Sequence, residues 1–402
     1  MSRKAWRGLL SASTLTLGLV VGTERGETHK IISSKYTYNR DVFPILRQRC
    51  GQCHWADGVA PMSLMTFKDA YPWGESLRAE LLTGHMPPWN VVDNIGAFKS
   101  RPEITAPEID TLLTWASGGT PEGDPAHSPP AVSWPREWPL GRPDLLLEPL
   151  SAFKLPAEVS DSVGEFTLLT HTIEAKWLRA IDLLPGTPAI VRNATVSIRS
   201  QPGDLSSDAG LETERMIAVW VPGEVPVTMA GGTAFHLPAA AELVVHVHYK
   251  KTYRYSGKEV ADRSSVGLYF ADGPALDIRR WTITSPDVTA RNGTPLTFSR
   301  IVDEDLTVLA LIPDPALSNA RLEVTAVTLG GSRVPLAHLA IRPDWTRRYW
   351  FDRPIALARG SRVEVVVVLN GADGLLPPAA SPLPPQRLTG APIQVMFDVV
   401  PG

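Results

Sequence analysis

The spacing of hydrophobic positions changes near residue 143. Before that point the clearest pattern is helical. Thr105 and Glu108 have the spacing of a capping box, an apolar face that includes Trp115 follows, and Gly118 ends the pattern. The sequence therefore predicts a helix over residues 105–118, at the end of a small helical domain.

Beyond residue 143, short runs of branched apolar residues are separated by Gly, Pro, Asp and Asn. Such runs are typical of strands joined by turns. They cover residues 195–199, 242–249, 265–270, 306–311, 321–327, 362–369 and 393–400. With few helical patterns among them, antiparallel sandwiches are favoured. The predicted fold is multidomain: a small all-α domain, then two antiparallel β-sandwich (jelly-roll) domains.

The N-terminus has the form of a secretory signal. Three basic residues, Arg3, Lys4 and Arg7, precede an apolar stretch over residues 8–22. That stretch is short for a membrane span, so we expect a periplasmic or otherwise exported protein without a stable span. The alternative is an uncleaved N-terminal anchor.

The motif with the most specific chemistry is Cys50-Gly51-Gln52-Cys53-His54. This pattern is typical of c-type haem attachment, in which two thiols form thioethers with one porphyrin and the adjacent imidazole binds the iron. Zinc would need further cysteines or histidines nearby, and a redox dithiol would leave His54 without a role. We therefore predict one covalent haem held by Cys50, Cys53 and His54.

The second axial ligand is expected on the loop at residues 85–89, which contains Met86 followed by two prolines and Trp89. The prolines stiffen the loop, so Met86 can be held toward the iron while Trp89 packs on the ring. Alternative ligands are Met62, Met65 and His85. Methionine–histidine ligation raises the haem potential and favours electron transfer.

Composition limits the kinds of molecule that the protein can bind. The 402 residues carry a net charge of −3 without a long basic run, so nucleic acid is excluded as a partner. Hydrophobic content of 44% with 20% charged residues is ordinary for a globular chain. Both cysteines lie in the haem motif, which leaves no structural disulfide framework.

One further ligand candidate lies in the predicted strand over residues 242–249. Strand alternation places His246 and His248 on the same face, near enough to share a metal ion. His171, His236 and His338 are scattered, and each is interpreted as an ordinary residue of the core or surface.

Residues 220–223, 235–239, 243–249 and 262–270 resemble the first catalytic sandwich of the copper type II, ascorbate-dependent monooxygenases, which include peptidylglycine α-hydroxylating monooxygenase. Residues 348–357 and 360–369 resemble strands of the second sandwich of that family. The segment with the haem motif and residues 86–89 is similar to the cytochrome domain joined to such sandwiches in bacterial proteins. The resemblance implies both sandwich folds and, in the family, two copper sites.

This chain departs from the family at its copper ligands. His248 matches a strand histidine, but Arg192-Asn193 stands where the family has a His-His pair. Residues 312–317 lack the expected His-x-His motif, and Met396 matches the methionine ligand. The resemblance then implies a degenerate copper-monooxygenase-like scaffold. An arginine in place of imidazole would repel a cation.

Two functions follow. The first is an exported cytochrome that transfers one electron to a redox partner protein and is not an enzyme. The alternative is a haem-fed copper monooxygenase, an oxidoreductase with one copper at His246, His248 and Met396. The predicted divisions are a signal peptide and flexible start (1–30), a cytochrome c-like domain (31–124), a proline-rich linker (125–143), and monooxygenase-like sandwiches (144–273 and 274–402).

Overall fold

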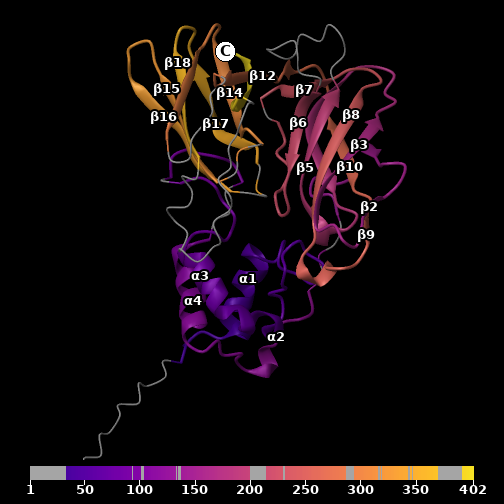
Figure 1. Cartoon of the computed structure of the whole chain (residues 1–402), viewed down its shortest axis with the longest axis vertical. Helices are drawn as coiled ribbons and strands as arrows, with labels where there is room; N and C mark the ends of the chain where they lie inside the picture. Colours follow the sequence, from indigo (N-terminus) through magenta and orange to yellow (C-terminus); the bar gives the residue numbers. More distant parts are fainter. Residues whose placement is uncertain are drawn as a thin grey trace, which may run out of the picture.

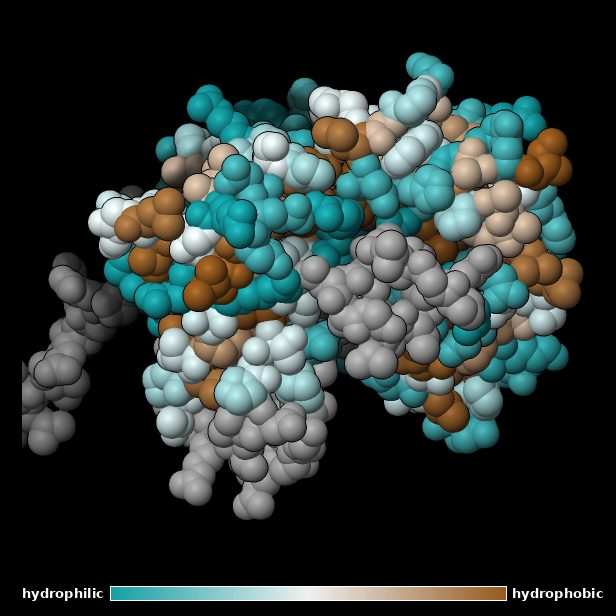
Figure 2. Space-filling view, turned by 90° about the horizontal axis from the view of Figure 1, so that it is seen from above, coloured by the Kyte–Doolittle hydropathy of each residue, from teal (hydrophilic) through white to brown (hydrophobic). Residues whose placement is uncertain are grey.

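A computed structural model places two β parts side by side, with a helical part below both in the view of Figure 1. It describes residues 33–92, 94–100, 104–132, 134, 137–199, 214–229, 231–286, 294–315, 317, 319–342, 345, 347–369 and 392–402. The predicted signal peptide, residues 1–30, lies outside these ranges. No helix within them is both long and apolar enough to cross a bilayer. Seen from above, hydrophobic side chains are scattered among hydrophilic ones (Figure 2).

The first part, here called the helical segment, runs from residue 33 to residue 128. Its helices are α1 (Phe43–Arg49), α2 (Phe67–Ala70), α3 (Gly74–Leu82) and α4 (Ala106–Ser117), with single turns at Tyr38–Val42, Tyr71–Trp73 and Pro125–His127. The capping box of Thr105 and Glu108 is present at the start of α4, which confirms the predicted helix. Trp115 is fully buried in a small core with Tyr38 and Leu46.

The prediction of a small all-α domain ahead of two β-sandwiches is wrong. The chain is mostly β, and its helices are short. Residues 50–66 form turns and bends, because this stretch lacks a helical repeat of apolar positions. Residues 89–99 join the β structure: Val91 bridges to Leu339 and Phe98 bridges to Phe351. The segment that carries the haem motif is therefore not a separate helical domain.

The first β unit contains strands β1 to β11. Sheets with the orders β3-β8-β5-β6 and β1-β10-β4-β7-β11 share one hydrophobic core, and β2 pairs with β9. The bounds are β1 Leu145–Leu147, β2 Phe153–Leu155, β3 Asp161–Leu169, β4 Lys176–Leu184, β5 Val191–Arg199, β6 Glu214–Trp220, β7 Thr233–Leu237, β8 Glu242–Lys250, β9 Val260–Asp262, β10 Ser265–Phe270 and β11 Leu276–Asp277. Trp138, from the predicted linker, packs on Gly267 of β10.

The second β unit contains strands β12 to β19. Sheets with the orders β12-β19-β14-β17 and β13-β18-β15-β16 share a second core, which also holds Phe98 of the helical segment. The bounds are β12 Arg279–Thr284, β13 Leu296–Ile301, β14 Leu306–Pro313, β15 Ala320–Val327, β16 Arg333–Ile341, β17 Tyr349–Leu357, β18 Arg362–Leu369 and β19 Gln394–Pro401. The strands predicted from the sequence are confirmed, except that Ile393 precedes β19.

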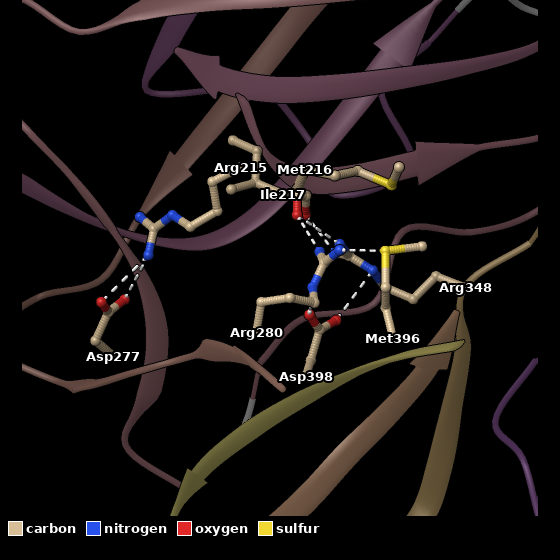
Figure 3. A network of polar contacts seen from close by, with 8 residues as sticks. All are labelled: Arg215, Met216, Ile217, Asp277, Arg280, Arg348, Met396 and Asp398. Carbon is tan, nitrogen blue, oxygen red and sulfur yellow. Dashed lines mark hydrogen bonds and ion pairs between the residues drawn. The ribbon is translucent and has the colours of Figure 1, made fainter. Parts of the chain in front are cut away.

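A buried network of charges joins the two β units (Figure 3). Asp398 lies between Arg280 and Arg348, with its carboxylate oxygens 3.4 and 3.1 Å from their Nε atoms. Both arginines also donate to the Met216 carbonyl on β6, at 2.7 and 2.9 Å, and Arg348 donates to Ile217 as well. Ile217 is the extra residue of a bulge in the β5–β6 pairing. Because a bulge interrupts the ladder of hydrogen bonds, the Met216 and Ile217 carbonyls can accept from these arginines outside the sheet.

Asp182 on β4 gives the stability of the first β unit a pH dependence. It is 4% exposed and lines a cavity of about 40 Å³. Burial raises the pKa of Asp182 to about 6, and the Leu183 amide that donates to its carboxylate opposes this shift. The folded state thus binds the proton more tightly than the unfolded chain. The resulting stability is fully present below the unfolded pKa of about 3.9 and is lost as pH rises through about 6.

Asp182→Asn is therefore expected to stabilise the protein at pH 8 by about 3 kcal/mol, because the buried carboxylate no longer has to ionise. The amide oxygen can still accept from Leu183. At pH 4 the difference from the wild type should vanish. Urea unfolding of both proteins at the two pH values measures it, and an equal difference at pH 4 and pH 8 would contradict the assignment.

Candidate functional site

The haem motif begins where α1 ends. Cys50 caps the C-terminus of α1, and the amides of Cys53 and His54 donate to its carbonyl oxygen at 3.1 and 2.9 Å. The Ala60 amide then donates to the Cys53 carbonyl at 3.1 Å. These bonds hold both cysteines and the histidine on one tight turn.

The His54 side chain is held in the form that binds a metal. Its Nδ1 lies 3.2 Å from the Met62 carbonyl oxygen. Because a carbonyl can only accept, Nδ1 carries the proton and Nε2 keeps its lone pair. Burial lowers the pKa of His54, and the bond to Met62 opposes that shift. A neutral imidazole with an orienting bond on Nδ1 is the arrangement expected of a haem ligand.

The two thiols are half-buried and form no disulfide. Burial raises the pKa of Cys50 to about 12 and that of Cys53 to about 11. A redox-active pair needs a thiolate, which these raised pKa values disfavour. Within the described ranges, no group of three or more His, Cys, Asp or Glu side chains could hold a metal ion.

Two thiols and one imidazole, the groups that would hold a covalent haem, lie on a single turn beside the apolar side chains of Trp55, Met62 and Trp134. A cavity of about 550 Å³ opens next to this turn between Phe43, Gln52 and Trp134. Neither the cysteines nor His54 line the cavity, so it is not assigned to the haem.

The candidates for the second axial ligand lie in three places. Met86 is half-buried in the loop after α3, and its amide donates to the Glu80 carbonyl at 3.3 Å. His85 contacts the preceding helix α3: its Nδ1 lies 3.2 Å from the Glu80 carboxylate. Met65 is buried in the small core, and Met62 is next to His54 through its carbonyl. Met86 remains the predicted ligand.

Trp89, expected to pack on the haem ring, contacts the second β unit. Its ring is 5.9 Å from that of Tyr349, in an edge-on arrangement. Asn90 donates to the Trp345 carbonyl at 3.2 Å, and Val92 donates to His338 at 3.0 Å. The pairing of this stretch with β16 and β17 accounts for the difference.

Arginines of the β units hold the loops around the haem motif, a feature that the sequence analysis missed. Arg192 on β5 donates to the Val59 carbonyl at 2.7 Å, and Arg254 donates to Ala56. Arg342 donates to the Gly84 carbonyl at 3.3 Å, next to His85 and Met86. These partners are far apart in the sequence, so no local pattern could indicate them.

The proposed copper ligands are held by separate partners. His246 and His248 share one face of β8, as strand alternation predicts. His246 Nε2 lies 3.3 Å from Glu214, and His248 Nε2 lies 2.8 Å from Asp161. Asn193, at the place expected for the His-His pair, has its amide 3.3 Å from His248 Nδ1.

Met396, by contrast, is buried in the network between the β units. Its sulfur accepts from Arg280 at 3.0 Å (Figure 3). The Met396 sulfur already contacts the positively charged guanidinium of Arg280. This charge would repel a metal ion at the same sulfur. The structure therefore does not assemble His246, His248 and Met396 into one site.

No known family matches the chain, and no curated protein matches it. Among solved structures, it is similar to the major capsid protein P2 from bacteriophage PM2, with 9% identity over 64% of this chain and 96% of that chain and a TM-score of 0.29. It is also similar to allantoicase, with 8% identity over 62% of this chain and 81% of that chain and a TM-score of 0.19. At these scores neither likeness carries an argument about function.

Proposed function

We propose that the protein is an exported c-type haem protein that transfers single electrons to and from a redox partner protein. The observation that carries the proposal is the turn from Cys50 to His54, where two half-buried thiols lie on the same turn as an imidazole oriented by the Met62 carbonyl. When bound there, haem supplies a one-electron couple at its iron.

The residues of this chain have distinct roles in that function. Cys50 and Cys53 hold the porphyrin through thioethers, and His54 binds the iron through Nε2. The Met62 carbonyl keeps the proton on Nδ1, which fixes the ring and its basicity. The arginine-held loops at residues 56–59 and 84 keep the motif and the Met86 loop against the β units. The β units act as the scaffold that docks the partner.

The test is to produce the full chain in a host that matures c-type cytochromes and to assay the denatured chain for retained haem. Haem is expected to remain on the wild type after denaturation. It should be lost in the double variant Cys50→Ala/Cys53→Ala. His127→Gln, a histidine on an exposed turn outside the motif, is the matched control and should keep its haem. Denatured wild type without haem would refute the proposal.

Met86→Ala is expected to remove the sixth ligand without removing the haem. The ferric protein should lose the weak long-wavelength absorption band that methionine ligation produces, and its reduction potential should fall, because methionine raises it. Met62→Leu, Met65→Leu and His85→Gln should leave the band in place. If one of these three variants loses the band while Met86→Ala keeps it, the residue changed in that variant is the ligand instead of Met86.

A further inference from the structure

Three parts of the chain meet at Cys53. Its sulfur lies 3.9 Å from the Pro222 carbonyl oxygen of the first β unit. Gly223 follows with a φ of 79°, and a Cβ added there would lie 3.8 Å from the same sulfur. The loop therefore contacts the haem motif at a residue that has no side chain. The next residue, Glu224, accepts from Arg347 at 2.9 Å.

Arg347 connects this loop to the loop that carries Met86. The residue precedes β17, and its side chain is 7% exposed. Its guanidinium lies 5.9 Å from the centre of the Trp89 ring. Its Nε is buried and makes no hydrogen bond within the part of the chain that the structure describes. The buried guanidinium of Arg347 thus contacts Glu224 and Trp89, and Glu224 follows the loop that contacts Cys53.

Arg192 approaches the motif from β5. It donates to the Val59 carbonyl at 2.7 Å, and Ala60, the next residue, donates to the Cys53 carbonyl. Arg347 is held by Glu224, which follows the Pro222-Gly223 loop that contacts the Cys53 sulfur. Both guanidinium groups are therefore fixed one residue away from groups that contact Cys53, which the proposed function assigns to haem attachment.

We propose that Arg192 and Arg347 form the cationic side of the haem site and set its reduction potential. The inference rests on the proposed function. Reduction of ferric haem adds one electron, supplied by the redox partner, and no bond forms or breaks. Positive charge in a buried site stabilises the state that has gained the electron. Glu224 offsets part of the charge of Arg347, so the three residues together determine the potential.

The test is a spectroelectrochemical titration of the haem-loaded full chain at pH 8. Arg192→Gln is expected to shift the reduction equilibrium about tenfold toward the oxidised state, which is about 59 mV for one electron. Arg347→Gln should lower the potential as well. Glu224→Gln should raise it, because removing the carboxylate leaves Arg347 without its counter-charge. The double variant Arg347→Gln/Glu224→Gln should return toward the wild type.

Two controls separate charge from packing. Arg347→Lys keeps the charge and should keep the potential, even if the protein is less stable. Arg359→Gln removes an exposed arginine just beyond the far end of β17 and should have no effect. If Arg347→Gln fails to fold, Arg192→Gln and Glu224→Gln decide the question.

Unchanged potentials in Arg192→Gln and Glu224→Gln would overturn the inference while the haem and the proposed function stand. A wild type without covalent haem would overturn both.

Discussion

Asp398→Ala is expected to destabilise the protein by about 3–5 kcal/mol, because it leaves two buried arginines without their shared carboxylate. The side chains of Arg280, Arg348 and Asp398 are 4%, 3% and 1% exposed. Like charges that share one carboxylate in a buried site repel each other once it is removed. The two arginines also hold the Met216 carbonyl of the first β unit, so the loss should weaken the contact between the units.

The matched control is Glu304→Ala. Glu304 pairs with Arg279, the neighbour of Arg280, at 2.9 Å, and its side chain is 53% exposed. An exposed pair contributes about 0–1 kcal/mol, so this variant should unfold close to the wild type. Urea unfolding of the three proteins at pH 7 provides the comparison. Equal midpoints for Asp398→Ala and Glu304→Ala would show that the network does not stabilise the fold.

The second large effect is expected at Phe98, with a loss of about 3–5 kcal/mol in Phe98→Ala, because a large buried ring is replaced by a cavity. Phe98 is 5% exposed in the core of the second β unit, with its ring centre 4.7 Å from Phe351 and 5.3 Å from Tyr349. The Lys99 amide donates to Trp350, and the Asp352 amide donates to Ala97. The helical segment is thus anchored here by both ring and backbone.

Leu329→Ala is the control for this variant, because Leu329 belongs to the same β unit and is 72% exposed. Its change should stay within about 0.5 kcal/mol. Thermal unfolding followed by near-ultraviolet circular dichroism reports on the aromatic core directly. If Phe98→Ala and Leu329→Ala unfold at the same temperature, the helical segment is not anchored in that core.

The local features of the chain were predictable from its sequence. The capping box at Thr105 and Glu108 places α4, since a helix start depends on residues three positions apart. Alternation places His246 and His248 on one face of β8. In each case the determining residues are neighbours in the chain.

The features that sequence reasoning missed depend on contacts between distant residues. Trp89 and Phe98 pack on strands more than two hundred residues away, so their loop gives no sign of it. Met396 matches a copper ligand by position, yet its partner is Arg280. The one available signal was chemical: arginines within or next to apolar strands, such as Arg280 in β12 and Arg348 just before β17, predict buried ion pairs that bring strands together.

The most direct test of the haem site is the metal and haem content of the exported wild-type protein after exposure to copper and dialysis. We expect one iron per chain, held by haem that survives denaturation, and no copper. Absence of iron would contradict the haem site. Copper at one per chain, lost on changing His246 and His248, would contradict the electron-transfer assignment and support a copper-dependent oxidoreductase.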